Sequence, residues 1–148
     1  MNPYHYQECG LDNIWLLNGY EIHETAYGKG VSFVRAEELD SAIAKALTEK
    51  PAPLTGKEFR FLRIMLDMSQ RTVGELMGKE AQTVALWEKS EALKPDADFL
   101  FRHIYRQTAI DRNENYRELV ERLNHMDRSE NDARMTFKAT ETGWDQAA

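Results

Sequence analysis

Hydrophobic and polar residues alternate along the first third of the chain, a pattern typical of short β-strands. Three strands are predicted, at about residues 14–17, 20–25 and 31–34. Asn18-Gly19 suits a turn between the first two strands, and the run at residues 27–30 suits a turn between the last two. We therefore expect a small sheet at the start of the chain.

After the third strand the hydrophobic period becomes that of a helix. Leu39, Ile43 and Leu47 recur at every fourth position, which predicts a helix at residues 37–48 with one apolar face. The run Lys-Pro-Ala-Pro at residues 50–53 then ends this helix, because proline lacks an amide donor and biases the residue before it away from helix. Residues 1–50 are thus predicted to form an N-terminal α/β module for partner binding or dimerisation.

The pattern is helical from there to about residue 126. Thr55 and Glu58 have the spacing of a capping box, which predicts the start of a new helix. Four further helices are predicted, at residues 70–77, 81–89, 97–108 and 113–126. The last of these carries an apolar stripe, which fits either packing onto the other helices or pairing with a second chain.

The fold class expected from these elements is α+β. A small N-terminal sheet-plus-helix module precedes an all-α helix-turn-helix bundle at residues 54–108. A C-terminal helix and tail follow at residues 109–148. The tail is polar but contains Phe137 and Trp144, which favour a short strand docked nearby.

The stretch from Leu66 to Ser90, LDMSQRTVGELMGKEAQTVALWEKS, has the features of a helix-turn-helix motif. Such a motif needs two short helices, a tight corner and a small residue where they approach. Ser69 suits the N-cap of the first helix, Gly74 the close approach and Gly78 a positive φ at the corner. The second helix places Val84 and Trp87 inward. Its outward surface is then Ala81, Gln82, Thr83, Ala85 and Leu86.

The net charge of -6 argues against binding to nucleic acid, but the charge is unevenly distributed along the chain. Residues 1–50 carry four basic and eight acidic side chains, and residues 96–148 carry eight and eleven. Residues 55–95 carry seven basic and six acidic side chains, so the motif lies in the one segment that is not acidic. Binding to nucleic acid needs positive potential on one face, and net charge mainly affects solubility.

The composition is that of a folded globular chain, with a hydrophobic fraction of 42%. No run approaches the roughly 18 consecutive apolar residues of a membrane span, and residues 1–10 do not have the pattern of a signal peptide. We therefore expect a cytoplasmic protein without membrane contact. Cys9 is the only cysteine, which excludes an internal disulfide and every multi-cysteine zinc site.

The stretch from Leu62 to Ser90 resembles the lambda-repressor and Cro-like, or Xre-type, helix-turn-helix family. The shared pattern is a basic residue in the preceding helix, then Ser-Gln, Gly, Gln-Thr-Val and Trp-Glu. This likeness covers residues 54–105. The layout of a small N-terminal module followed by the motif is also similar to that of MqsA-type antitoxins and related bacterial regulators.

The resemblance implies that Gln70 contacts the DNA backbone and that Gln82 and Thr83 reach base edges or phosphates. It also implies that Arg63 pairs with Glu88. A glutamine amide can satisfy N6 and N7 of adenine together. The expected DNA-binding residues are Ser69, Gln70, Arg71, Lys79, Ala81, Gln82, Thr83, Ala85, Leu86 and Lys89. Candidate phosphate contacts are Lys57, Arg60, Arg71, Lys79 and Lys89.

Three positions depart from the family pattern. Glu80 replaces the usual Ser, Thr or Asp cap of the recognition helix, Lys79 replaces an apolar residue, and Ser90 stands where glycine is common. Glu80 suits the helix dipole but would repel a nearby phosphate, so it lowers the expected DNA affinity. MqsA-type antitoxins bind zinc through paired Cys-x-x-Cys motifs, and since this chain has only Cys9, no zinc is expected.

No metal site, cofactor or catalytic site is expected. Cys9 with His5 and His23 lacks a fourth metal ligand and an oriented base. Several acidic residues resemble carboxylate pairs but lie at predicted helix starts, where acids act as caps. They are Asp96, Asp98, Asp111 and Glu114.

Two functions fit these observations. The first is a sequence-specific DNA-binding transcriptional regulator, a homodimer that binds a double-stranded operator with its recognition helix in the major groove. The second is the antitoxin of a toxin-antitoxin system, which neutralises a toxin protein by direct contact and autoregulates its operon. A helical bundle without a ligand is disfavoured by the joint match of the motif residues.

Overall fold

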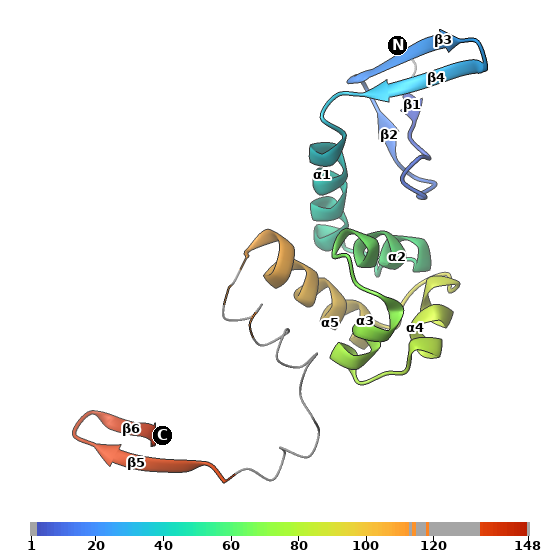
Figure 1. The fold of residues 1–148 in the computed structure, drawn as a ribbon. Helices are drawn as coiled ribbons and strands as arrows, with labels where there is room; N and C mark the ends of the chain where they lie inside the picture. Colours follow the sequence, from blue (N-terminus) through green and yellow to red (C-terminus); the bar gives the residue numbers. More distant parts are fainter. Residues whose placement is uncertain (1–2, 113, 115–117, 119–133, 148) are drawn as a thin grey trace.

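The N-terminal part of the chain forms two small antiparallel sheets followed by a helix (Figure 1). The computed structural model describes residues 3–112, 114, 118 and 134–147. β1 (Tyr4–His5) pairs with β2 (Trp15–Leu16), and β3 (Tyr20–Thr25) pairs with β4 (Gly28–Phe33). Strands were predicted at three places, but they belong to two sheets rather than one.

The hairpin predicted at Asn18-Gly19 is wrong. The strand before it pairs with β1, and Gly19 instead has φ 81° and accepts a 2.8 Å hydrogen bond from the amide of Val34. The turn predicted at residues 27–30 is also misplaced, because Thr25 and Gly28 already face each other across the hairpin. Thr25 Oγ1 closes that tighter turn, since it donates to Gly28 O at 2.7 Å and accepts from the amide of Tyr27.

α1 (Ala36–Glu49) confirms the helix predicted at residues 37–48. Its apolar face buries Ile43 and Leu47 against the rest of the core. α2 (Gly56–Met65) begins at the predicted capping box, in which Thr55 Oγ1 accepts from the amide of Glu58 and Glu58 Oε1 accepts from the amide of Thr55. α1 therefore ends, and α2 begins, where local sequence signals place them.

The helical bundle continues through α3 (Gln70–Met77), α4 (Ala81–Glu88) and α5 (Pro95–Tyr105). The helices predicted at residues 70–77 and 81–89 are confirmed. The one predicted at residues 97–108 begins earlier, because proline suits the first position of a helix, and it ends in a π-helical turn, η1 (Arg106–Ile110). The helix predicted at residues 113–126 lies outside the described residues except for 114 and 118, which are helical.

The segment between α1 and α2 is held by several contacts. Arg102 of α5 donates to the carbonyl of Lys50 at 2.6 Å and to the carbonyl of Ala52. Lys50 Nζ also lies 2.5 Å from Glu58 Oε1. Buried apolar side chains on both sides of this segment belong to one core cluster, among them Leu11 and Phe59. The division into domains at this segment stays a prediction, but the two parts pack together.

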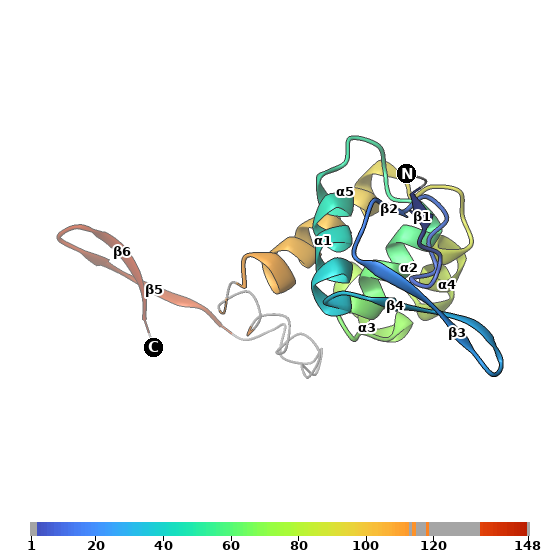
Figure 2. The same ribbon diagram turned by 90° about the horizontal axis from the view of Figure 1, so that it is seen from above.

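The tail contains a separate hairpin of β5 (Thr136–Thr140) and β6 (Gly143–Ala147). The side chains of Phe137 and Trp144 are 54% and 74% exposed. The tail thus forms two strands that pair with each other, where one docked strand was expected. The α+β class predicted from the sequence is confirmed, and the view from above shows the β3–β4 hairpin projecting past the helices (Figure 2). Among the described residues, no helix has the length and apolar character needed to cross a membrane.

Candidate nucleic-acid interface

α3 and α4 meet at a tight corner. Ser69 caps α3, with its Oγ accepting from the amide of Thr72 at 3.0 Å. Gly78 ends the helix with φ 69°, in the left-handed region that glycine enters without strain. The amide of Lys79 then donates to Gly74 O at 2.7 Å, and a Cβ atom on Gly74 would lie 2.5 Å from Lys79 O. The roles predicted for the two glycines are therefore confirmed, and they set the angle at which α4 leaves the corner.

A buried ion pair fixes the far end of α4. Glu88 Oε1 lies 2.7 Å from Nη2 of Arg63 and accepts from its Nε at 2.8 Å. The side chains are only 13% and 6% exposed, and Arg63 also donates to the carbonyl of Met68 at 2.9 Å. The predicted pair between α2 and α4 is thus confirmed, with a further contact to the loop before α3.

Gln70 is a third member of this network. Its Nε2 donates to Glu88 Oε2, so the first residue of α3 is joined to the last residue of α4. The family resemblance implied a contact of Gln70 with the DNA backbone, but the bond to Glu88 was not predicted, because no local spacing relates residues eighteen positions apart. The contact of Gln70 with the DNA backbone stays a prediction. It would have to use the side-chain amide oxygen of Gln70, or Gln70 would first have to release Glu88.

The inner face of α4 is packed as predicted. Val84 is fully buried, and the indole of Trp87 meets the ring of Phe59 edge-on with centroids 5.8 Å apart. Phe59 in turn packs against Phe101 of α5 at 4.5 Å. α4 is therefore held against α2 by an aromatic contact, and α2 is held in the same way against α5.

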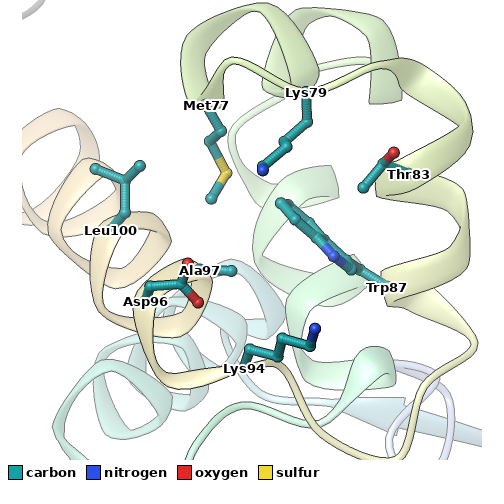
Figure 3. A pocket seen from close by; sticks show the side chains of 8 residues that line it. All are labelled: Met77, Lys79, Thr83, Trp87, Lys94, Asp96, Ala97 and Leu100. Atoms are coloured by element: carbon teal, nitrogen blue, oxygen red, sulfur yellow. The ribbon is translucent and has the colours of Figure 1, made fainter.

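The outer face of α4 remains open. Gln82 and Leu86 are exposed, the latter to 67%, and Ala81 and Ala85 are partly exposed beside them. Thr83 is partly exposed like Ala81 and Ala85, but it differs from the expected arrangement because its side chain lines a hollow toward α5 (Figure 3). The exposed ridge of α4 that could enter a DNA groove thus consists of the side chains of Ala81, Gln82, Ala85 and Leu86.

Glu80 occupies the N-cap of α4 but makes no side-chain capping hydrogen bond. This fits its replacement of the usual Ser, Thr or Asp, whose shorter side chains satisfy the first amides. The carboxylate is exposed and lies at the same end of α4 as Gln82. It therefore lowers the positive potential there.

The cations near this face fall into two groups. Within the described part of the chain, Arg60, Lys79 and Lys89 have no ion pair, and all three are exposed. Arg71 and Lys57 are already paired, the first with Glu75 at 3.2 Å and the second with Asp12 at 2.6 Å. Three of the five predicted phosphate contacts are thus available without breaking an ion pair.

Protein-family models, curated proteins and solved structures were compared with the chain, and nothing matches. The interface is therefore interpreted from its own geometry.

The side chains considered for metal binding or nucleophilic attack have other partners. His5 stacks on Trp15 with ring centroids 4.1 Å apart, and His23 Nε2 lies 2.8 Å from Ser32 Oγ. Burial raises the pKa of the Cys9 thiol, which disfavours the reactive thiolate. Among the described residues, no three His, Cys, Asp or Glu side chains are grouped to hold a metal ion.

Two of the paired acidic residues are explained by the start of α5. Asp96 and Asp98 lie in its first turn, as predicted, where their charge favours the helix dipole. Asp98 Oδ1 also accepts from the amide of Leu54 at 2.7 Å and from Nε of Arg102 at 2.9 Å. Asp98 therefore ties α5 to the segment before α2.

Proposed function

We propose that this chain is a sequence-specific DNA-binding regulator that places α4 in the major groove. The observation that carries the proposal is the contrast between the two faces of α4. Its inner face is fixed by Val84, Trp87 and the pair of Arg63 with Glu88, and its outer face is open. A helix held in this way from a tight corner is the arrangement by which helix-turn-helix proteins present side chains to base edges.

The residues on and beside the open face have distinct roles in this proposal. Gln82 reads bases, because its amide can bond N6 and N7 of adenine at once. Leu86 offers an apolar contact to the methyl group of thymine. Arg60, Lys79 and Lys89 neutralise phosphates and carry no sequence information. Glu80 limits the affinity, so base contacts contribute a large share of the binding.

A homodimer is part of the same proposal. One motif of this kind reads only a few base pairs, and two of them on a two-fold axis bind half-sites about one helical turn, roughly 34 Å, apart. Light scattering of the intact protein at tens of micromolar, alone and with DNA, measures the oligomeric state. A monomer under both conditions contradicts the dimer.

The test of DNA binding is selection from randomised duplexes with the intact protein, followed by a gel shift. We expect an enriched duplex with two-fold symmetry, bound more tightly than a scrambled duplex of the same composition. The absence of enrichment, together with no shift of any duplex at low salt, contradicts the proposal.

A second function is supported by exposed apolar side chains in and beside the N-terminal strands. Four side chains there are each more than half exposed: Trp15, Leu17, Ile22 and Val34. Apolar groups gathered on one small unit are typical of a protein-binding surface. We propose that this unit binds a partner protein, as an antitoxin binds its toxin, while α4 binds the operator.

Coexpression with the product of an adjacent gene tests the second function. We expect the two proteins to copurify and the chain to relieve any growth arrest that the other protein causes. Leu17→Asp with Ile22→Asp should abolish both effects and leave operator binding intact, since neither residue lies near α4. Unchanged copurification by this variant contradicts the assignment of the surface.

A further inference from the structure

A hollow of about 460 Å³ lies between the helix-turn-helix corner and the start of α5 (Figure 3). Its volume is within the range of sites that bind small organic molecules. The walls come from both sides of the bundle, with Met77 at the end of α3, Trp87 on α4 and Leu100 on α5. These three side chains give the hollow an apolar lining.

The indole of Trp87 is held in place by the core. Its ring meets Phe59 edge-on, at an interplanar angle of 85°, and this contact fixes the orientation of the ring. The indole is nevertheless only partly buried, and it lies across the hollow between α4 and α5 (Figure 3). A flat apolar ligand can therefore pack on the indole without a change in the core.

Two lysines point into the same hollow. Lys79 lies at the corner, and Lys94 is the residue directly before α5. Their ammonium groups approach the indole of Trp87 from opposite sides (Figure 3). Within the described part of the chain, neither lysine has an ion pair. Asp96 is the one acidic side chain in the lining, so the charged groups leave an excess of one positive charge. The hollow therefore favours an anion.

We propose that this hollow binds a small organic anion with a flat apolar ring, such as an aromatic carboxylate. The ring packs on Trp87 between Met77 and Leu100, the carboxylate accepts a hydrogen bond from Lys79, and Lys94 on the other side of the indole adds positive charge. Lys79 is also one of the cations available to a DNA phosphate. Ligand and operator then compete for Lys79, and this coupling, unlike ligand binding itself, rests on the proposed function.

The test uses three probes with the same ring and different charges: 1-naphthylacetate, 1-naphthylacetamide and 1-naphthylmethylammonium. Binding is followed by NMR at the indole N–H of Trp87 in the intact, ¹⁵N-labelled protein, with the signal assigned by its loss in Trp87→Phe. We expect a saturable shift with the carboxylate, binding of the amide weaker by at least about tenfold, and no shift with the cation.

Two variants and a control locate the site. Lys79→Gln should weaken binding of naphthylacetate by about tenfold, since it removes a charge-assisted hydrogen bond, and Lys94→Gln should weaken it less, since it removes only a nearby positive charge. Lys89→Gln removes the same charge near Trp87 but outside the lining of the hollow, and it should leave binding unchanged. All three side chains are exposed, so the variants are expected to fold.

Four outcomes overturn the site: no saturable shift at millimolar probe, equal binding of the three probes, equal weakening by Lys89→Gln, or a Trp87 shift that follows protein concentration rather than probe. The last would assign the hollow to a second copy of the chain. With an enriched duplex, naphthylacetate should weaken DNA binding by the factor by which DNA weakens binding of the probe. A chain that binds no DNA sinks the proposed function and leaves the NMR result standing.

Discussion

The side chains of Arg63, Glu88 and Gln70 form a nearly dry network at the base of the motif, with the ion pair almost out of contact with solvent. A buried charge is costly unless it is paired, and the pair itself adds little over well-packed apolar groups. The network therefore acts mainly to fix α4 at one angle. Its effect on DNA binding is expected to exceed its effect on stability.

Removal of one member should be costly. Arg63→Met leaves Glu88 buried with Gln70 as its one remaining side-chain partner among the described residues, and we expect a loss of about 3 kcal/mol or more in the free energy of unfolding. Arg63→Met combined with Glu88→Leu should cost much less, because no charge is then stranded. Urea denaturation of the two single variants and the double variant measures the difference. Additive losses contradict the coupling.

Lys57 and Asp12 form an exposed pair, and under the proposed function this pair competes with a DNA phosphate. The hydrogen bond and the charge of Lys57 lower the pKa of Asp12 below its ordinary value. The pair is therefore fully formed above the usual pKa of an aspartate, near 4, and it is lost as the pH falls through the lowered value. At neutral pH a phosphate has to displace Asp12 in order to reach Lys57.

Asp12→Asn should strengthen binding to cognate and random DNA alike, and steepen the dependence of log K on log salt by about one, because it frees one cation for a phosphate. Asp67→Asn is the control, since it removes the same charge from an exposed residue for which, in the described part of the chain, no ion pair is found. Fluorescence anisotropy over a salt series gives both slopes. Equal changes in the two variants indicate a general charge effect and contradict release of Lys57.

The helices were predicted from the sequence more accurately than the strands. Capping residues and the glycine corner are local signals. Thr55 therefore predicted the start of α2 correctly, and Ser69 and Gly78 predicted the start and the end of α3. The N-terminal strands depend on pairing between distant residues. β2 pairs with β1 ten residues away, which no turn motif shows, and the pattern at Asn18-Gly19 was misleading for that reason.

The candidate interface shows the same division. The pair of Arg63 and Glu88 was predicted because the family pattern contains both residues. The partners of Gln70 and Lys57 were not predicted, since Glu88 and Asp12 are brought to them only by tertiary packing. The position of Thr83 beside the hollow was not predicted either. Residues of α5 line this hollow, and the helical period of α4 gives no information about where α5 lies.

Gly74 should be essential to the angle between α3 and α4. Gly74→Ala places a methyl group against the backbone of the corner, 2.5 Å from Lys79 O, and we expect a loss of about 1–3 kcal/mol in the free energy of unfolding. Gly30→Ala is the control, because its added Cβ would meet only a methyl group of Thr25 at 3.8 Å and should change stability by less than about 0.5 kcal/mol. Similar urea midpoints for the two variants contradict the role of Gly74.

The N-terminal sheets, α1 and the helical bundle share one core cluster, and Arg102 of α5 also bonds the carbonyls of Lys50 and Ala52. This packing predicts cooperative unfolding, even though the sequence suggested two modules. Calorimetry should give one transition, with a calorimetric enthalpy equal to the van't Hoff enthalpy. Two separated transitions contradict a shared core and favour independent modules.

Under the proposed function, the distribution of charge accounts for DNA binding by an acidic chain. The net charge is -6, but Lys79 and Lys89 are exposed beside the two ends of α4, and Arg60 is exposed on α2. Few cations and the nearby Glu80 imply a shallow salt dependence, because each neutralised phosphate adds about one to the slope. Binding then depends on dimerisation and on contacts with bases, more than on charge.

Comparison of Gln82→Ala with the unchanged protein on two duplexes tests base readout by α4 most directly. The intact dimer is titrated, by fluorescence anisotropy at one salt concentration, with the enriched duplex and with a scrambled duplex. The proposed mechanism predicts a loss of about 1–3 kcal/mol on the enriched duplex and little change on the scrambled one, since Gln82 contacts base edges and not phosphates. Equal loss on both duplexes, or no change on either, would contradict it.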